Sequence, residues 1–232
     1  MKKLIVGFGD SWTYGSELEF PQQQCWVTQV ADLFNADYKN LGTPASSIGY
    51  LTNQLFDFIK QKPNDYKIIF MVGLTGLTRY LSYSNALHEF INITPEANYR
   101  TTNIPVNGRP PDIVIEFSTL AGEMYRMVEC VEYNQFIATQ AVALFQNYCS
   151  RCNIDIIFFS YFDLCTFDSA LVDTSLIYPT TLTYALTGQE YDIPKIRDNE
   201  YFQGKLFHPN KQGHTKIAEL LKDFYDTNYS RD

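Results

Sequence analysis

Short apolar runs alternate along the chain with longer segments in which apolar residues recur every three or four positions. A short, almost wholly apolar run is typical of a strand buried on both faces of a parallel sheet, and the longer recurrence is typical of an amphipathic helix. The runs predict strands at residues 3–8, 38–42, 67–73 and 154–161, and the helical spacing predicts helices at residues 22–34, 48–59, 122–148 and 210–225.

The alternation of strands and helices predicts an α/β fold, in which a doubly wound parallel sheet carries helices on both faces. In such sheets the ligand crevice lies beyond the carboxyl ends of the strands. Four segments that follow predicted strands are therefore expected on one edge of the sheet: Ser11, residues 42–47, residues 73–78 and the region after Tyr161.

Two segments show neither the strand pattern nor the helix pattern and are predicted as loop insertions. Residues 82–119 are interrupted by Asn and Pro, although residues 112–117 have the pattern of a short strand, and residues 163–203 are rich in Thr, Tyr and Asp. The chain has 232 residues, of which 45% are hydrophobic and 19% are charged. We expect one globular domain spanning residues 1–232.

Charge excludes two classes of partner. The net charge is -8, with 18 basic and 26 acidic residues and no basic run. Neither a nucleic-acid backbone nor an anionic membrane surface is therefore expected as a partner.

Targeting signals and cysteine usage indicate a cytoplasmic protein. The first apolar run is interrupted by Gly7 and followed by Asp10, which makes it too short for a signal peptide, and no stretch is long enough to span a bilayer. The five cysteines are odd in number and sparse, which favours a reducing compartment, and the source is expected to be microbial or viral. Cys149 and Cys152 have metal or redox spacing, but no second pair completes a site, so neither metal nor cofactor is expected.

Ser11 is the first candidate for chemistry. A serine at the sharp turn after a buried strand exposes its hydroxyl at the sheet edge, where a backbone N–H can face the same reacting oxygen. The tripeptide Gly9-Asp10-Ser11 fits that geometry, although Asp and Ser also form ordinary turns. Asp10 itself is expected to hydrogen-bond loop amides.

Three blocks in order along the chain point to a known family. They are Gly9-Asp10-Ser11, residues 40–47 (Asn-Leu-Gly-Thr-Pro-Ala-Ser-Ser) and residues 208–214 (His-Pro-Asn-Lys-Gln-Gly-His). Together they resemble the SGNH (GDSL-like) hydrolase superfamily. The resemblance implies a flavodoxin-like three-layer α/β/α sandwich, a serine nucleophile, a histidine base and an oxyanion hole drawn from three blocks.

Carried over by position, Ser11 is the nucleophile, His208 is the general base and the Ser11 backbone N–H is the first oxyanion donor. The second donor, a glycine N–H in the family, aligns with Ala45, and Gly42 is the competing assignment. Because only the N–H is needed, alanine can serve, provided that Ala45 avoids a positive φ.

The third block departs from the family. The family asparagine that donates to the oxyanion is replaced by Thr75, whose hydroxyl has a shorter reach. Arg79, a few residues further on, is assigned either to the substrate and loop or to a surface ion pair. The second histidine of the last block, His214, is expected to make a packing or capping contact.

The largest departure lies three residues before His208, where Lys205 replaces the family aspartate. Lysine cannot accept the Nδ1 proton of the imidazole. Either a Ser-His dyad operates, with His208 oriented through a backbone carbonyl, or another acid completes an atypical triad. The candidates for that acid are Asp198, Asp192, Glu200 and Asp163.

These residues predict a serine esterase that acts on a small acyl ester, with acetyl on a carbohydrate as the favoured substrate. The alternative is a degenerate hydrolase that binds a glycan without turning it over. A nucleotide or redox protein is disfavoured, because neither glycine-containing turn resembles a phosphate-binding loop. The oligomeric state is left open.

Overall fold

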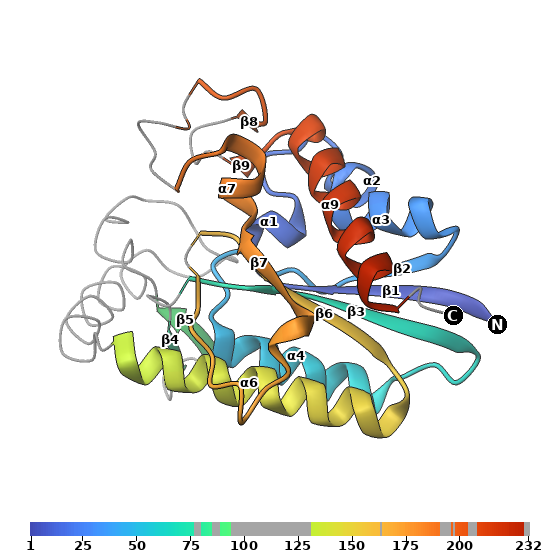
Figure 1. The fold of residues 1–232 in the computed structure, drawn as a ribbon, viewed down its shortest axis with the longest axis vertical. Helices are drawn as coiled ribbons and strands as arrows, with labels where there is room; N and C mark the ends of the chain where they lie inside the picture. Colours follow the sequence, from blue (N-terminus) through green and yellow to red (C-terminus); the bar gives the residue numbers. More distant parts are fainter. Residues whose placement is uncertain are drawn as a thin grey trace.

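The computed structural model describes residues 1–76, 80–84, 89–93, 131–162, 164–190, 196, 198–203 and 208–229 (Figure 1). A five-stranded sheet in the order β2-β1-β3-β6-β7 forms its centre, and every neighbouring pair is parallel. This order corresponds to the flavodoxin-like arrangement, whose switch point lies between the first and third strands. The strands are β1 (Lys2–Phe8), β2 (Asp37–Asn40), β3 (Tyr66–Leu74), β6 (Asp155–Ser160) and β7 (Ile177–Thr181).

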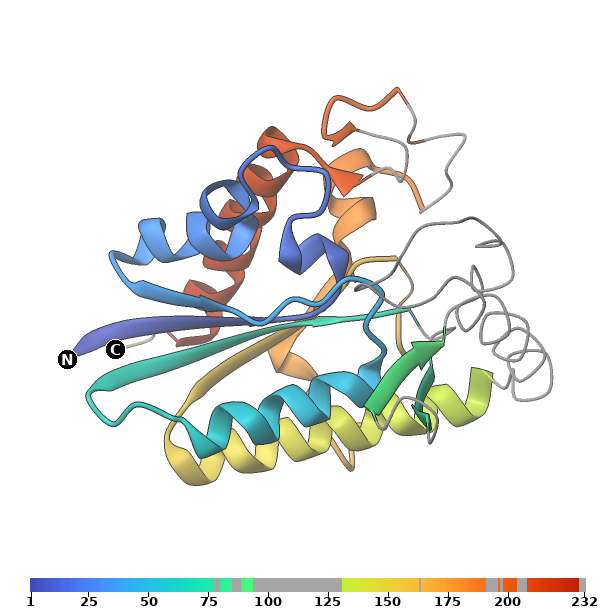
Figure 2. The same ribbon diagram turned by 180° about the vertical axis from the view of Figure 1, so that it is seen from behind.

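Helices cover both faces of the sheet, which confirms the predicted three-layer fold (Figures 1 and 2). One face carries α1 (Ser11–Tyr14), α2 (Pro21–Gln24), α3 (Trp26–Phe34), α7 (Leu182–Thr187) and α9 (Lys211–Tyr229). The opposite face carries α4 (Ile48–Lys60) and α6 (Val131–Cys152), which contact each other.

The central strands β1, β3 and β6 are mostly apolar because both of their faces are buried. In β1, Ile5 packs in the core cluster under α3 and α9, whereas Leu4 and Val6 pack in the cluster under α4 and α6. The same alternation continues in β3, where Ile69 and Phe70 belong to opposite clusters. Side chains that alternate between two faces leave no polar position in a central strand.

The described residues of the second predicted loop insertion, residues 163–203, include more regular structure than expected. They contain η2 (Thr174–Leu176), the fifth sheet strand β7, helix α7 and the two-residue strand β8 (Phe202–Gln203). Strand β7 escaped the sequence reading because it lies at the sheet edge, where Pro179 is tolerated and a continuous apolar run is not needed.

The other segment read as a loop insertion contains an antiparallel hairpin, β4 (Tyr80–Ser84) and β5 (Glu89–Ile93). The strand expected at residues 112–117 lies outside the described residues. The helix expected over residues 22–34 is divided at Cys25 into α2 and α3. Within the described ranges, no helix has both the length and the apolar character needed to cross a bilayer.

Candidate active site

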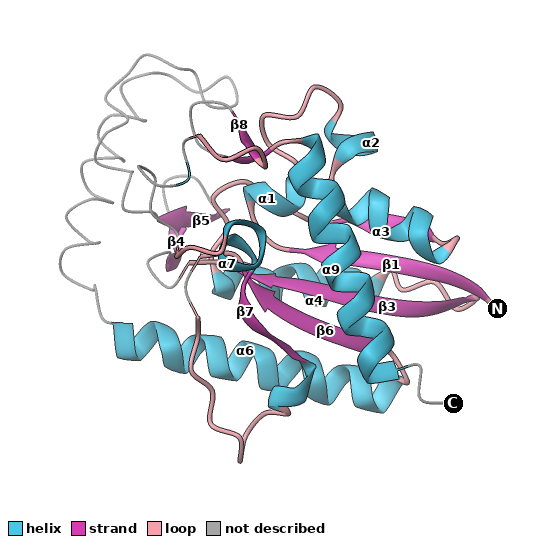
Figure 3. Ribbon diagram, turned by 45° about the horizontal axis from the view of Figure 1, so that its top comes forward, coloured by secondary structure: helices cyan, strands magenta, loops and turns pink. Residues whose placement is uncertain are grey.

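Ser11 is the first residue of α1, immediately beyond the carboxyl end of β1 (Figure 3). Asp10 is fully buried, and its carboxylate accepts a hydrogen bond of 3.0 Å from the Trp12 N–H, so it caps the helix as expected. The turn needs a glycine at position 9, because a Cβ there would lie 2.1 Å from Thr13 Oγ1 and φ is +152°. The Ser11 side chain forms no hydrogen bond with another described residue, so its hydroxyl is available for a ligand.

Tyr161 fixes the base of this turn. Its ring is fully buried, 5.3 Å from the Trp12 ring, and its hydroxyl contacts Thr13 Oγ1. Burial raises the pKa of Tyr161 well above its ordinary value, so the phenol stays neutral. A Cβ on Gly73 would lie 2.3 Å from the Tyr161 hydroxyl, so the glycine at the end of β3 makes room for it.

The loop after β2 packs directly against α1. The Asn40 Nδ2 donates to the Thr13 carbonyl over 2.8 Å, and the Gly42 N–H donates to Asn40 Oδ1 over 2.8 Å. A Cβ on Gly42 would lie 2.4 Å from the Tyr14 backbone nitrogen. Glycine at position 42 therefore allows close packing against α1. Because the Gly42 N–H is already engaged, Ala45 is favoured over Gly42 as the candidate for the second oxyanion donor.

Ala45 adopts a φ of +62°, so the condition that alanine avoid a positive φ at this position is not met. Residues 43–46 form a turn closed by the Ser46 N–H donating to the Thr43 carbonyl over 3.1 Å. Pro44 in second place and a positive φ in third place are the features of a type II turn, which favours glycine at the third position. Alanine there costs about 1–2 kcal/mol. The Ala45 N–H donates to no other described residue.

Thr75 follows β3, the neighbour of β1 in the sheet. Its side chain is 2% exposed, and its Oγ1 has no hydrogen-bond partner within the described part of the chain. A buried hydroxyl without a partner is unfavourable, so this position carries a cost that a ligand oxygen would offset. Arg79 lies outside the described residues.

His208 reaches the same edge from the far end of the sequence. It begins β9 (His208–Pro209), which pairs antiparallel with β8 and contacts α1 (Figure 1). Its side chain is 7% exposed. The structure therefore brings together the short elements that carry Ser11 and His208, residues separated by most of the chain.

Glu17 contacts the His208 ring and was overlooked in the sequence reading. Its Oε2 lies 2.9 Å from His208 Nδ1. Asp198 is exposed and Glu200 Oε2 accepts from Gln212 Nε2, so neither of these two candidate acids takes this place. Asp163, Asp192 and Lys205 lie outside the described residues.

The backbone of Glu17 has a φ of +68°, in the left-handed region that non-glycine residues rarely adopt. The only signal in the sequence was an acidic residue six positions after the serine, in the loop that leaves α1. Glu17 does not lie among the residues just before His208, where the family aspartate is expected.

His214 belongs to the structural frame. It is fully buried, and its Nδ1 accepts a hydrogen bond of 3.1 Å from the Trp26 N–H, so it caps the start of α3. Burial, and then the nearby His208, lower the pKa of His214 to about 3. The ring is therefore neutral near pH 7.

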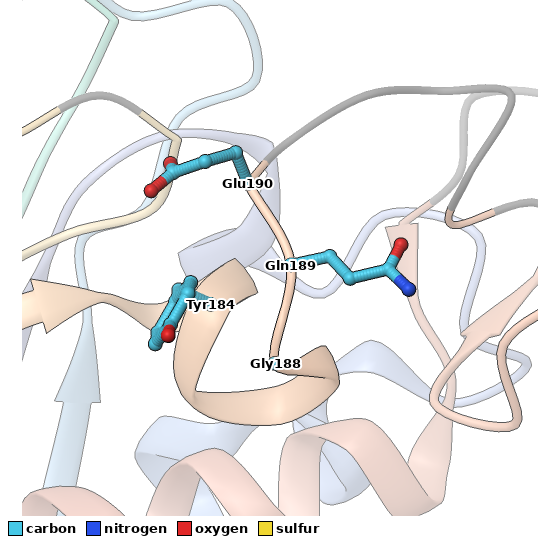
Figure 4. A pocket seen from close by; sticks show the side chains of 4 residues that line it. All are labelled: Tyr184, Gly188, Gln189 and Glu190. Atoms are coloured by element: carbon cyan, nitrogen blue, oxygen red, sulfur yellow. The ribbon is translucent and has the colours of Figure 1, made fainter.

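An open hollow of about 620 Å³ lies beside α7 and is lined by Tyr184, Gly188, Gln189 and Glu190 (Figure 4). Tyr184 is 44% exposed. In Figure 4, Tyr184 and Glu190 extend to one side of the loop and Gln189 to the other. Helix α7 lies next to α1 in all three ribbon views, so the hollow is on the same edge as Ser11 (Figures 1–3). In the described residues, no three His, Cys, Asp or Glu side chains gather as a metal site.

No family model matches the chain, and no curated protein matches it in sequence. Solved structures do. The psychrotrophic esterase EstA from Pseudoalteromonas sp., inhibited by monoethylphosphonate, is 12% identical with a TM-score of 0.52, over 99% of this chain and 100% of that one. A two-domain esterase active on acetylated mannans is 12% identical with a TM-score of 0.51, over 99% of this chain and 50% of that one.

A member of the lipolytic protein G-D-S-L family from Veillonella parvula is 13% identical with a TM-score of 0.41, over 99% of this chain and 100% of that one. At such identities the likeness is one of fold. The fold expected from the resemblance to SGNH hydrolases is confirmed.

Proposed function

We propose that this protein is a serine ester hydrolase in which Ser11 is the nucleophile and His208 the general base. The observation that carries the proposal is the contact between α1 and β9, together with the engagement of His208 Nδ1 by a carboxylate. An ionised carboxylate only accepts, so Nδ1 carries the proton and Nε2 is the ring nitrogen left to accept the Ser11 proton.

The reaction proceeds in two displacements. Ser11 Oγ forms a bond to the acyl carbon while His208 Nε2 takes its proton, and the proton passes to the leaving alcohol as the ester C–O bond breaks. Water then attacks the acyl carbon while His208 takes its proton, and that proton passes to Ser11 Oγ as the acyl–Oγ bond breaks and the carboxylic acid leaves. No cofactor or metal ion takes part in either step.

Three donors support the developing oxyanion in this proposal: the N–H groups of Ser11 and Ala45 and the hydroxyl of Thr75. None of them donates to another described residue. Donors left without partners in the free enzyme are free to bind charge that develops in the transition state. The unpartnered Thr75 hydroxyl supports its assignment most directly, because its burial is otherwise unexplained.

The favoured substrate is a small acyl group, such as acetyl, on a carbohydrate. The hollow beside α7 combines a half-exposed tyrosine ring with amide and carboxylate side chains, which suits a polar ring better than a long lipid tail. One structural neighbour is an esterase active on acetylated mannans. Arg79 is a further candidate for substrate contact.

The test is hydrolysis of p-nitrophenyl acetate and of acetylated oligosaccharides by the wild type and by Ser11→Ala. We expect Ser11→Ala to lose at least about 1000-fold in kcat/KM, because the nucleophile is removed. It should also lose labelling by a phosphonate, and its stability should change by less than about 0.5 kcal/mol. Ser16→Ala, in the loop that follows α1, is the matched control and should keep full activity.

If the wild type hydrolyses no acyl ester and phosphonate does not label Ser11, the esterase proposal fails. Binding of an unmodified oligosaccharide under those conditions would support the alternative of a glycan-binding module. The replacements by Thr75 and Lys205 are the features that motivate this alternative.

A further inference from the structure

We infer that Glu17 is the acid that positions His208, so that the positioning acid comes from the loop after the nucleophile's helix rather than from a residue just upstream of the histidine. The inference rests on the proposed function. It names the group that takes the place of the aspartate absent at Lys205.

The contact is made on the ring atom that an orienting acid must engage. Glu17 Oε2 lies 2.9 Å from His208 Nδ1, and the His208 backbone N–H lies 3.5 Å from the same oxygen. The His208 side chain is 7% exposed and the Glu17 side chain 22%, although Glu17 as a whole residue is exposed, so the carboxylate is partly shielded from water. Shielding strengthens the attraction between the carboxylate and an imidazolium.

A second link holds Glu17 in place from the histidine hairpin. Gln203 Nε2 donates to the Glu17 carbonyl over 3.0 Å, and Gln203 is the cross-strand partner of His208 in the β8–β9 pair. Glu17 is therefore bound to one residue of this pair through its backbone and to the other through its carboxylate. This arrangement fixes both the position of Glu17 and the plane of the ring.

The backbone of Glu17 supports the same conclusion. A φ of +68° is unfavourable for a side chain such as glutamate and would suit glycine. Strained backbone positions persist where surrounding contacts hold them, and they concentrate at functional sites. Here the strained conformation accompanies a carboxylate in contact with the histidine.

Chemistry explains why one acid is enough. The neutral His208 ring has one N–H, at Nδ1. Because this N–H already donates to Glu17, it is not available to an aspartate at position 205. In the acylation step, His208 becomes an imidazolium and Glu17 stabilises that charge without taking the proton. The replacement by Lys205 is then compatible with a complete triad of Ser11, His208 and Glu17.

The test compares Glu17→Gln with Glu19→Gln, which removes the same charge from an exposed residue of the same loop. For Glu17→Gln we expect kcat on p-nitrophenyl acetate to fall by about 100- to 10,000-fold, because the amide no longer favours the productive tautomer or the imidazolium. KM should change little.

A second measurement does not depend on activity. Long-range ¹H–¹⁵N spectra, with His208→Asn for assignment, report the tautomer of His208. We expect an Nδ1–H ring in the wild type and in Glu19→Gln, and a changed tautomer in Glu17→Gln.

Retention of kcat within about threefold of wild type by Glu17→Gln would overturn the inference and leave a Ser-His dyad. An Nε2–H ring in the wild type would overturn it as well. If the protein hydrolyses no ester, the spectra still decide whether Glu17 sets the tautomer, so the two proposals fail separately.

Discussion

Replacing Thr75 by valine should make the protein more stable and less active. Valine has nearly the shape of threonine, but a methyl group stands where the hydroxyl was. The Thr75 side chain is 2% exposed, and its Oγ1 has no partner within the described part of the chain. The substitution therefore removes a buried polar atom without breaking a hydrogen bond seen in the structure.

The two expected magnitudes have opposite signs. A buried, unpartnered hydroxyl costs about 1–3 kcal/mol, so Thr75→Val should raise the free energy of unfolding by roughly that amount. For a chain of this length, the melting temperature should rise by about 2–4 °C for each kcal/mol. If the hydroxyl binds the oxyanion, kcat/KM should fall by about 100- to 1000-fold, as for the loss of one such donor elsewhere.

Urea unfolding and ester hydrolysis measure the two effects on the same samples. Thr183→Val is the matched control, because Thr183 is fully buried and its Oγ1 donates to the Tyr161 carbonyl over 2.7 Å. It should destabilise the protein by about 0.5–1.5 kcal/mol. A similar loss of stability in Thr75→Val would refute the reasoning on burial. A gain of stability with unchanged kcat/KM would remove Thr75 from the oxyanion hole.

Two further predictions concern backbone strain and pH. Ala45→Gly should preserve kcat and raise the free energy of unfolding by up to about 1 kcal/mol, because relief of the positive φ exceeds the conformational entropy lost by glycine. The control is Ala138→Gly in helix α6, which should lose stability. A similar loss in Ala45→Gly would contradict the prediction. Burial holds the pKa of His214 at about 3 against an ordinary 6.5, so the unfolded state binds a proton that the folded state does not. Stability is therefore complete above about pH 6.5 and falls by up to about 1.4 kcal/mol per pH unit as the pH drops toward 3. Urea unfolding at about pH 7, 6 and 5 measures how the free energy of unfolding changes with pH. This change should be smaller in His214→Asn than in the wild type, and an equal change would contradict the assignment.

Local pattern was enough to predict most of the fold. The central strands β1, β3 and β6 are buried on both faces, so their continuous apolar runs are unmistakable in the sequence. The edge strand β7 has no such requirement and was read as a loop. The break between α2 and α3 at Cys25 was missed because the Pro-Gln-Gln-Gln segment of α2 has no apolar pattern of its own, while the cap on α3 is the distant His214.

The candidate site divides in the same way. The sequence by itself determined that Ser11 follows a buried strand and that a histidine precedes the last helix, because both depend on local order along the chain. Only the tertiary structure decided which acid meets His208, since Glu17 and His208 are joined by the packing of β9 on α1 and not by spacing. It also showed that the Gly42 N–H is engaged by the Asn40 side chain, because the partner of an N–H depends on its neighbours in space. Short-range patterns record which surfaces are buried, whereas the partner of a polar atom is set by the way distant segments pack.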